Sequence, residues 1–197
     1  MPSLNGVSTV SILPDDTGVT TESALDGVIR LLETAWLPAP PPEVSNFRYW
    51  PVPIPLFLAG IDALRDAAML SVSDAGNRGQ NTLRVVDLGC GIGTVLALLW
   101  QFGLTDLTGV EWFPQYAAVA RVLCPPAKII VGDIHDQDAL VASADIVYTY
   151  RPYRGQNDDD YNDWLVATML PGALLWTPQG SPKGCDHLGG WVYEVTA

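Results

Sequence analysis

The second half of the chain alternates short apolar runs with segments of helical periodicity, and this rhythm constrains the fold more than any other feature. Strands that alternate with helices form βαβ units, whose parallel sheet is covered by helices on both faces. The strand-like runs are Leu83–Leu88, Leu107–Glu111, Lys128–Val131, Asp145–Tyr150 and Ala173–Thr177, and the helical segments are Thr94–Phe102, Pro114–Leu123, Asp136–Ala142 and Tyr161–Leu170. We therefore predict a doubly wound α/β fold with a mostly parallel sheet.

A final strand-like run, Trp191–Thr196, follows Thr177 after only about a dozen residues. This distance is too short for a crossover helix followed by a further strand. We therefore predict that the last strand runs antiparallel to its predecessor, with the glycine-rich segment Gly184–Gly190 as the turn between them.

The first 80 residues have a different character. Helical spacing of apolar residues predicts one helix over Glu22–Trp36 and another over Leu56–Met69. Seven of the sixteen prolines fall between these helices, from Pro38 to Pro55, and the polar segment Ser71–Asn81 reads as a surface loop. We predict a helical, proline-rich lid over residues 1–80, attached to a single compact α/β domain over residues 81–197.

Charge and cysteine content exclude several classes of function. The chain has 22 acidic residues against 10 Lys and Arg, so its net charge is −12, and its few cations are scattered. Duplex nucleic acid is normally held by a basic stripe, so a nucleic acid partner is not expected. No run approaches the ~20 apolar residues of a membrane span. The three cysteines form no C-x-x-C pair, which predicts free thiols in the cytoplasm, and we expect no metal site.

The most informative segment lies where the first strand-like run turns into a helix. It reads Val86-Asp87-Leu88-Gly89-Cys90-Gly91-Ile92-Gly93-Thr94. Glycines at such a turn let the backbone approach a ligand, and the N–H groups of the helix start suit a carboxylate or phosphate. A dinucleotide fingerprint would place its third glycine at position 94, which is Thr94, so the spacing counts against NAD.

The pattern D-x-G-x-G-x-G resembles motif I of the class I S-adenosylmethionine-dependent methyltransferases. In that family an acidic residue at the end of the second strand binds the ribose hydroxyls, and Glu111 stands there, 24 residues after Asp87. Trp112 follows, where family members often carry a residue that packs on adenine. A Gly-Asp pair after the third strand is matched by Gly132 and Asp133. The motifs arrive in order over residues 83–177.

The resemblance implies a Rossmann-like sheet of strand order 3-2-1-4-5-7 and S-adenosylmethionine as cofactor. The family's sixth strand is expected to be missing, unless the weak strand signal of Ser8–Leu13 replaces it. The expected cofactor-binding residues are Tyr49, Asp87, Gly89, Cys90, Gly91, Gly93, Glu111, Trp112, Gly132, Asp133 and Ile134.

The expected acceptor-side residues, which we assign to catalysis, follow the fourth strand: Tyr150, Arg151 and Tyr153. Relatives that methylate amino groups often carry Asn/Asp-Pro-Pro-Tyr/Phe there. This chain keeps Pro152 and Tyr153 but lacks the initial Asn or Asp. Arg151 and Arg154 suit a carboxylate or phosphate, or simply offset the acidic run Asp158–Asp160.

We therefore predict a methyltransferase whose acceptor is a small molecule or a protein side chain. The alternative is a protein that binds S-adenosylmethionine without catalysis, as a regulatory or assembly subunit. An NAD-dependent or nucleotide-sugar enzyme ranks below both because of the glycine spacing. The oligomeric state and the atom that is methylated do not follow from the sequence.

Overall fold

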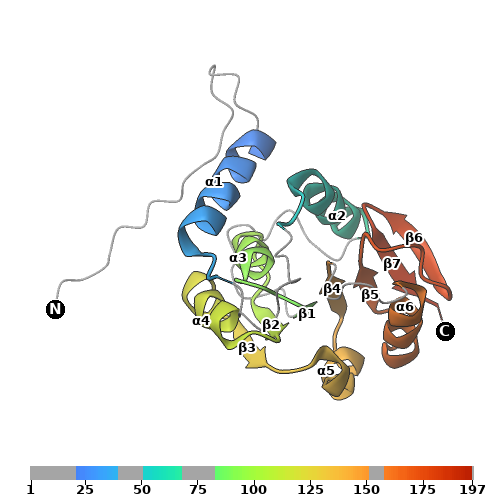
Figure 1. The fold of residues 1–197 in the computed structure, drawn as a ribbon. Helices are drawn as coiled ribbons and strands as arrows, with labels where there is room; N and C mark the ends of the chain where they lie inside the picture. The colour runs from blue at the N-terminus through green and yellow to red at the C-terminus, as the bar shows by residue number, and fades with distance from the viewer. Residues whose placement is uncertain (1–20, 40–50, 68–82, 151–157, 197) are drawn as a thin grey trace.

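The structure is a computed structural model that describes residues 21–39, 51–67, 83–150 and 158–196 (Figure 1). The predicted Ser8–Leu13 strand lies outside these residues. The helices are α1 (Thr21–Trp36), α2 (Ile54–Asp66), α3 (Thr94–Gln101), α4 (Pro114–Leu123), α5 (Asp138–Ala142) and α6 (Asp158–Thr168), with a 3-10 turn η2 (Ile134–Asp136). The strands are β1 (Arg84–Leu88), β2 (Asp106–Glu111), β3 (Lys128–Val131), β4 (Ile146–Thr149), β5 (Leu174–Trp176), β6 (Cys185–Gly189) and β7 (Val192–Val195).

The described strands form one sheet of order β3-β2-β1-β4-β5-β7-β6. The pairs of β1 with β2 and β4, of β2 with β3, and of β4 with β5 are parallel. The chain enters at β1 and winds outward to both sides, so the order reverses beside β1, where ligands of open α/β sheets bind. The predicted doubly wound fold and the order 3-2-1-4-5-7 are confirmed.

Helices cover both faces of the sheet, as the continuous apolar strands predict. On one face α2, α3 and α4 share a core with side chains such as Val85, Leu107 and Trp176. On the other face, α5 and α6 pack on Val86, Val147 and Leu175. The residues alternate between the two cores along each strand, because successive side chains point to opposite faces.

The sixth strand is present, so its predicted absence was wrong. β7 runs antiparallel to β5, as expected, but it is reached through β6, which pairs antiparallel with β7 at the sheet edge. Most of the residues predicted as a turn, Gly184–Gly190, therefore form the strand β6. The side chains of β6 are exposed or half-buried, so the segment carries no apolar run by which a strand is recognised.

Two helix boundaries also differ from the prediction. The segment predicted as one helix over Asp136–Ala142 is split into η2 and α5, and α6 begins three residues before Tyr161. Asp133 explains the first difference, because its side chain caps η2 by accepting from the N–H of His135. The start of α6 is polar and acidic, so it lacks the apolar spacing that locates a helix.

Helix α2 packs against the sheet at a glycine. The Phe57 ring stacks on the Trp176 indole, with centroids 5.3 Å apart, and a Cβ at Gly60 would overlap the same indole. Trp176 also meets Tyr148 edge-on, with centroids 5.1 Å apart. α2 thus shares one core with the sheet. The predicted division of the chain into a lid and an α/β domain at residue 80 stays a prediction.

Candidate active site

The carboxyl ends of β1, β2, β3 and β4 meet at one edge of the sheet, and those predicted cofactor residues that the structure describes lie there. The turn from β1 to α3 passes through Gly89, Gly91 and Gly93, whose φ angles are 80°, 56° and 83°. Only glycine adopts such angles readily, so the spacing seen in the sequence is required by the backbone path.

The backbone of this glycine loop is tied to β2 and to itself. Gly89 and Cys90 donate their N–H groups to the Val110 carbonyl at 2.9 and 3.0 Å, and Gly93 donates to the Cys90 carbonyl at 2.8 Å. Gly91 donates to the Glu111 carboxylate at 2.8 Å. The N–H groups at these four positions all donate within the protein, and the expectation that the N–H groups of the helix start bind an anionic ligand stays a prediction.

Glu111, at the end of β2, has a carboxylate held on two sides. One oxygen accepts from Gly91, and the other accepts from the Phe113 N–H at 2.8 Å. The residue is 4% exposed. Burial raises the pKa of this carboxyl, and the hydrogen bonds from Phe113, Gly91 and Trp112 oppose the rise. A carboxylate offers about four acceptor positions, so these backbone N–H groups do not fill all of them.

Asp87 is the most unusual group at this edge. It is 2% exposed, and its Oδ2 has no hydrogen-bond partner among the described residues. Burial raises its pKa well above the ordinary range, and the charge of Glu111 raises the pKa further. A buried carboxylate oxygen without a partner costs free energy that a bound donor would offset.

Cys90 lies inside the loop as a packing residue. A Cβ at Gly109 of β2 would lie 2.6 Å from the Cys90 Sγ and 2.7 Å from the Leu96 Cδ1. The pKa of the Cys90 thiol is raised well above its usual value by burial, and then by the charges of Asp87 and Glu111. A thiol in that environment does not ionise to the thiolate that nucleophilic attack requires.

The third strand contributes the segment Gly132–Ile134. Gly132 donates its N–H to the Glu111 carbonyl at 3.0 Å, and Asp133 caps η2. Ile134 is buried in the core of the α6 face. Trp112, beside Glu111, is 57% exposed, so much of this residue is accessible to solvent.

The acceptor side is only partly described. Tyr150 is half-buried and packs against the core that contains Trp176. The predicted residues Tyr49, Arg151 and Tyr153 lie outside the described residues. The structure adds a pair that we did not predict: the Thr149 hydroxyl lies 3.0 Å from the Tyr161 hydroxyl and 3.4 Å from the Leu88 carbonyl. In the sequence, the only indication of this contact is that a threonine ends an apolar strand.

Comparison with known proteins agrees with this geometry. Residues 86–151 match the family described as "Methyltransferase domain". A solved RNA methyltransferase from Salinibacter ruber, in complex with S-adenosyl-L-homocysteine, is similar with a TM-score of 0.50 and 18% identity, over 75% of this chain and 94% of its own. A putative RNA methyltransferase from Pyrococcus horikoshii has a TM-score of 0.51 and 18% identity, over 81% and 71%. Residues 86–151 thus match a methyltransferase domain, and the fold is that of these solved methyltransferase structures.

The methyltransferase domain predicted from the glycine loop is confirmed over residues 86–151. A search of curated proteins gives no match. None of the helices in the described ranges is long and apolar enough to cross a membrane. Within the same ranges, no three His, Cys, Asp or Glu side chains are grouped as metal ligands would be.

Proposed function

We propose that this protein transfers a methyl group from S-adenosylmethionine to a small molecule or a protein side chain. The observation that supports the proposal most is the pair of buried carboxyl groups beside the glycine loop. The backbone donors to Glu111 leave acceptor capacity on its carboxylate, and Asp87 keeps an oxygen without a described partner. S-adenosylmethionine carries ribose hydroxyls and an amino group that can donate to such acceptors.

We propose that the residues at the sheet edge bind successive parts of the cofactor, as the family resemblance implies. Glu111 would accept from the two ribose hydroxyls, and Trp112 and Asp133 would lie on the side of the adenine. Asp87 would face the amino acid part. Bound there, the cofactor supplies a methyl group on a positively charged sulfur. Two buried acidic side chains favour a positive ligand by Coulomb attraction.

The chain's task on the acceptor is chiefly alignment, because in-line transfer needs the reacting atoms close and correctly oriented. Tyr150, Arg151 and Tyr153 are proposed to form that side of the site. Acidic residues follow this segment in the chain, including the exposed Asp159, Asp160 and Asp163, and we propose that they flank the entrance. A polyanion would be repelled there, so we propose an acceptor other than nucleic acid. A cytoplasmic location stays a prediction.

Two measurements, made one after the other, test the proposal. Calorimetry with S-adenosylhomocysteine should give binding heat, whereas NADH should give none. Transfer of a radiolabelled methyl group from S-adenosylmethionine to fractions of a cell extract should then identify the acceptor class. Binding of NADH in place of S-adenosylhomocysteine would contradict the proposal. Binding of the cofactor with no transfer to any fraction would favour a regulatory or assembly role instead.

A further inference from the structure

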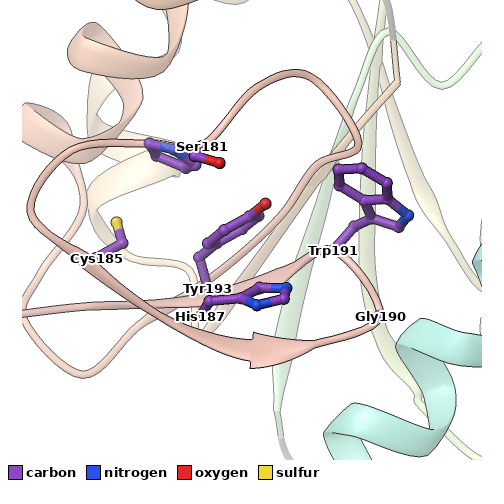
Figure 2. Close-up of a pocket in the computed structure, with 7 residues that line it drawn as sticks. Ser181, Cys185, His187, Gly190, Trp191 and Tyr193 are labelled. Carbon is purple, nitrogen blue, oxygen red and sulfur yellow. The ribbon is translucent and has the colours of Figure 1, made fainter.

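A hollow of about 500 Å³ lies between the β6–β7 hairpin and the loop of residues 177–184 that leads into it (Figure 2). Its volume is in the range of small-molecule sites, roughly 300–1,000 Å³. It is separate from the glycine loop, and the predicted cofactor residues do not line it. The side chains that concern us are Ser181, Cys185, His187, Trp191 and Tyr193.

The loop wall of the hollow is fixed by hydrogen bonds on both sides. The Tyr193 hydroxyl donates to the Gly180 carbonyl at 3.2 Å, and the Thr196 N–H donates to the Gly184 carbonyl at 2.9 Å. From α6, the buried Asn162 side chain donates to the Gln179 carbonyl. The hollow is therefore formed before any ligand arrives, which reduces the ordering cost of binding.

The hairpin wall carries aromatic rings and no formal charge. The His187 and Tyr193 rings lie 4.9 Å apart with an interplanar angle of 37°, and Trp191 stands at the hairpin tip. Ser181 lies on the loop across from these rings. Of the described residues that line the hollow, none is Lys, Arg, Asp or Glu. Such a wall suits a flat, uncharged ring system that stacks on aromatic faces and hydrogen-bonds at its edge.

Trp191 lies in a turn whose backbone conformation is unfavourable for a residue with a side chain. Gly189 pairs with Val192, so Gly190 and Trp191 form a two-residue turn, with φ angles of 51° and 64°. Turns with two positive φ angles prefer Asn-Gly or Gly-Gly, because a side chain is strained there. The Trp191 side chain nevertheless remains 38% exposed, so burial of the ring is incomplete. A strained residue that leaves its ring open is a candidate for ligand contact.

The hairpin tip lies at the same edge of the sheet as the glycine loop. Tyr148, Trp176 and Val192 form one row across β4, β5 and β7, and Trp191 comes just beyond that row. Strands are spaced by about 4.8 Å, so the tip is about 10 Å from the end of β4. A molecule that reaches from the hollow to the expected site of transfer must be at least about that long.

We propose that Trp191, His187 and Tyr193 bind a planar, uncharged aromatic or heteroaromatic ring of the methyl acceptor, about 10 Å from the atom that is methylated. The acceptor is then an extended molecule with a ring at one end. This inference rests on the proposed function for the identity of the ligand as an acceptor. The ring site itself does not depend on methyl transfer.

Saturation-transfer NMR with quinoline tests the site, in the presence of saturating S-adenosylhomocysteine so that the cofactor side is occupied. Wild type and the control W36A, which removes another exposed tryptophan, should both transfer saturation to quinoline. W191A and W191G should lose at least four-fifths of the signal while binding S-adenosylhomocysteine as wild type does. Cyclohexanol, which is not planar, should give little signal with any of these proteins.

The two substitutions of Trp191 separate ring contact from folding. Both remove the ring, but glycine also relieves the backbone strain, so W191G should melt at a higher temperature than W191A. Equal quinoline signals in W191A and wild type would overturn the proposal, as would equal signals from cyclohexanol. If S-adenosylhomocysteine fails to bind, the proposed function fails, and the quinoline experiment without it still decides whether the ring site exists.

Discussion

The carboxylate of Glu111 accepts a hydrogen bond from the backbone N–H of Gly91 at 2.8 Å, so the end of β2 holds the glycine loop that follows β1. The residue expected to bind the ribose thus also fixes the loop that surrounds the cofactor. Ligand binding and loop structure are joined in one side chain, and a substitution there affects both.

Substitution of Glu111 should weaken cofactor binding. E111A removes the charge-assisted hydrogen bonds to the backbone and the proposed ribose acceptor, so its affinity for S-adenosylhomocysteine should fall by about 1–3 kcal/mol, or roughly fivefold to 150-fold. E111Q retains one amide oxygen and should fall between E111A and wild type. Calorimetry measures both. D106A, at the opposite end of β2, is the control, and an unchanged affinity in E111A would remove Glu111 from the site.

Close packing at Gly109 gives a second prediction. G109A places a methyl group against the Cys90 Sγ and Leu96 Cδ1, so it should lower the free energy of unfolding by about 1–3 kcal/mol. C90A removes the Sγ, and the double variant G109A/C90A should recover part of the loss. Urea denaturation of the two single variants and the double variant measures the coupling. Strictly additive effects would show that Gly109 and Cys90 do not compete for this space.

The buried Asp87 carboxyl predicts a pH dependence. Its pKa is higher in the folded protein than in the unfolded chain, so the folded state binds more protons from this group. Its contribution to stability is therefore present below the unfolded pKa and is lost as the pH rises toward the folded pKa. D87N lacks this loss, so its stability relative to wild type should increase between pH 5 and pH 8.

Urea denaturation of D87N and wild type across that pH range measures the effect. D62N changes an exposed aspartate on α2 and serves as the control, whose difference from wild type should stay nearly constant. If the difference in stability between D87N and wild type does not change with pH either, Asp87 has the same pKa in the folded and unfolded protein.

A pair of helical glycines tests the packing of α2. G60A should lower the free energy of unfolding by about 1–3 kcal/mol, because the added methyl overlaps the Trp176 indole, which is confined by Phe57 and Tyr148. G27A on α1 meets no atom within 4 Å and should be neutral or stabilising by about 0.5–1 kcal/mol. Thermal melting of both variants compares them. If G60A were as stable as G27A, Trp176 would have room to move.

The sequence was sufficient for those features that depend on local pattern. The apolar runs located β1 to β5, and the positions of Asp87, Glu111 and Asp133 followed because parallel strands end at one edge. β6 was missed because its exposed residues form no apolar pattern. The Thr149–Tyr161 contact joins β4 to α6, which are separate elements. The hydrogen bonds from the glycine loop to Val110 and Glu111 depend on how β1 and β2 are aligned. Such contacts follow from tertiary structure and have no local signature.

The packing of α2 has a consequence for the order in which the chain folds. Residues 54–66 are made early, yet Gly60 fits against Trp176, and the Gly190 backbone lies so close to Ala59 that a Cβ would overlap the Ala59 carbonyl. Contacts between residues this far apart in the chain form slowly, because a long loop must close first. During synthesis, the part of α2 that packs on Trp176 and Gly190 therefore stays uncovered until the ribosome has released those residues. The nascent chain is most exposed to aggregation and to chaperone binding in that interval.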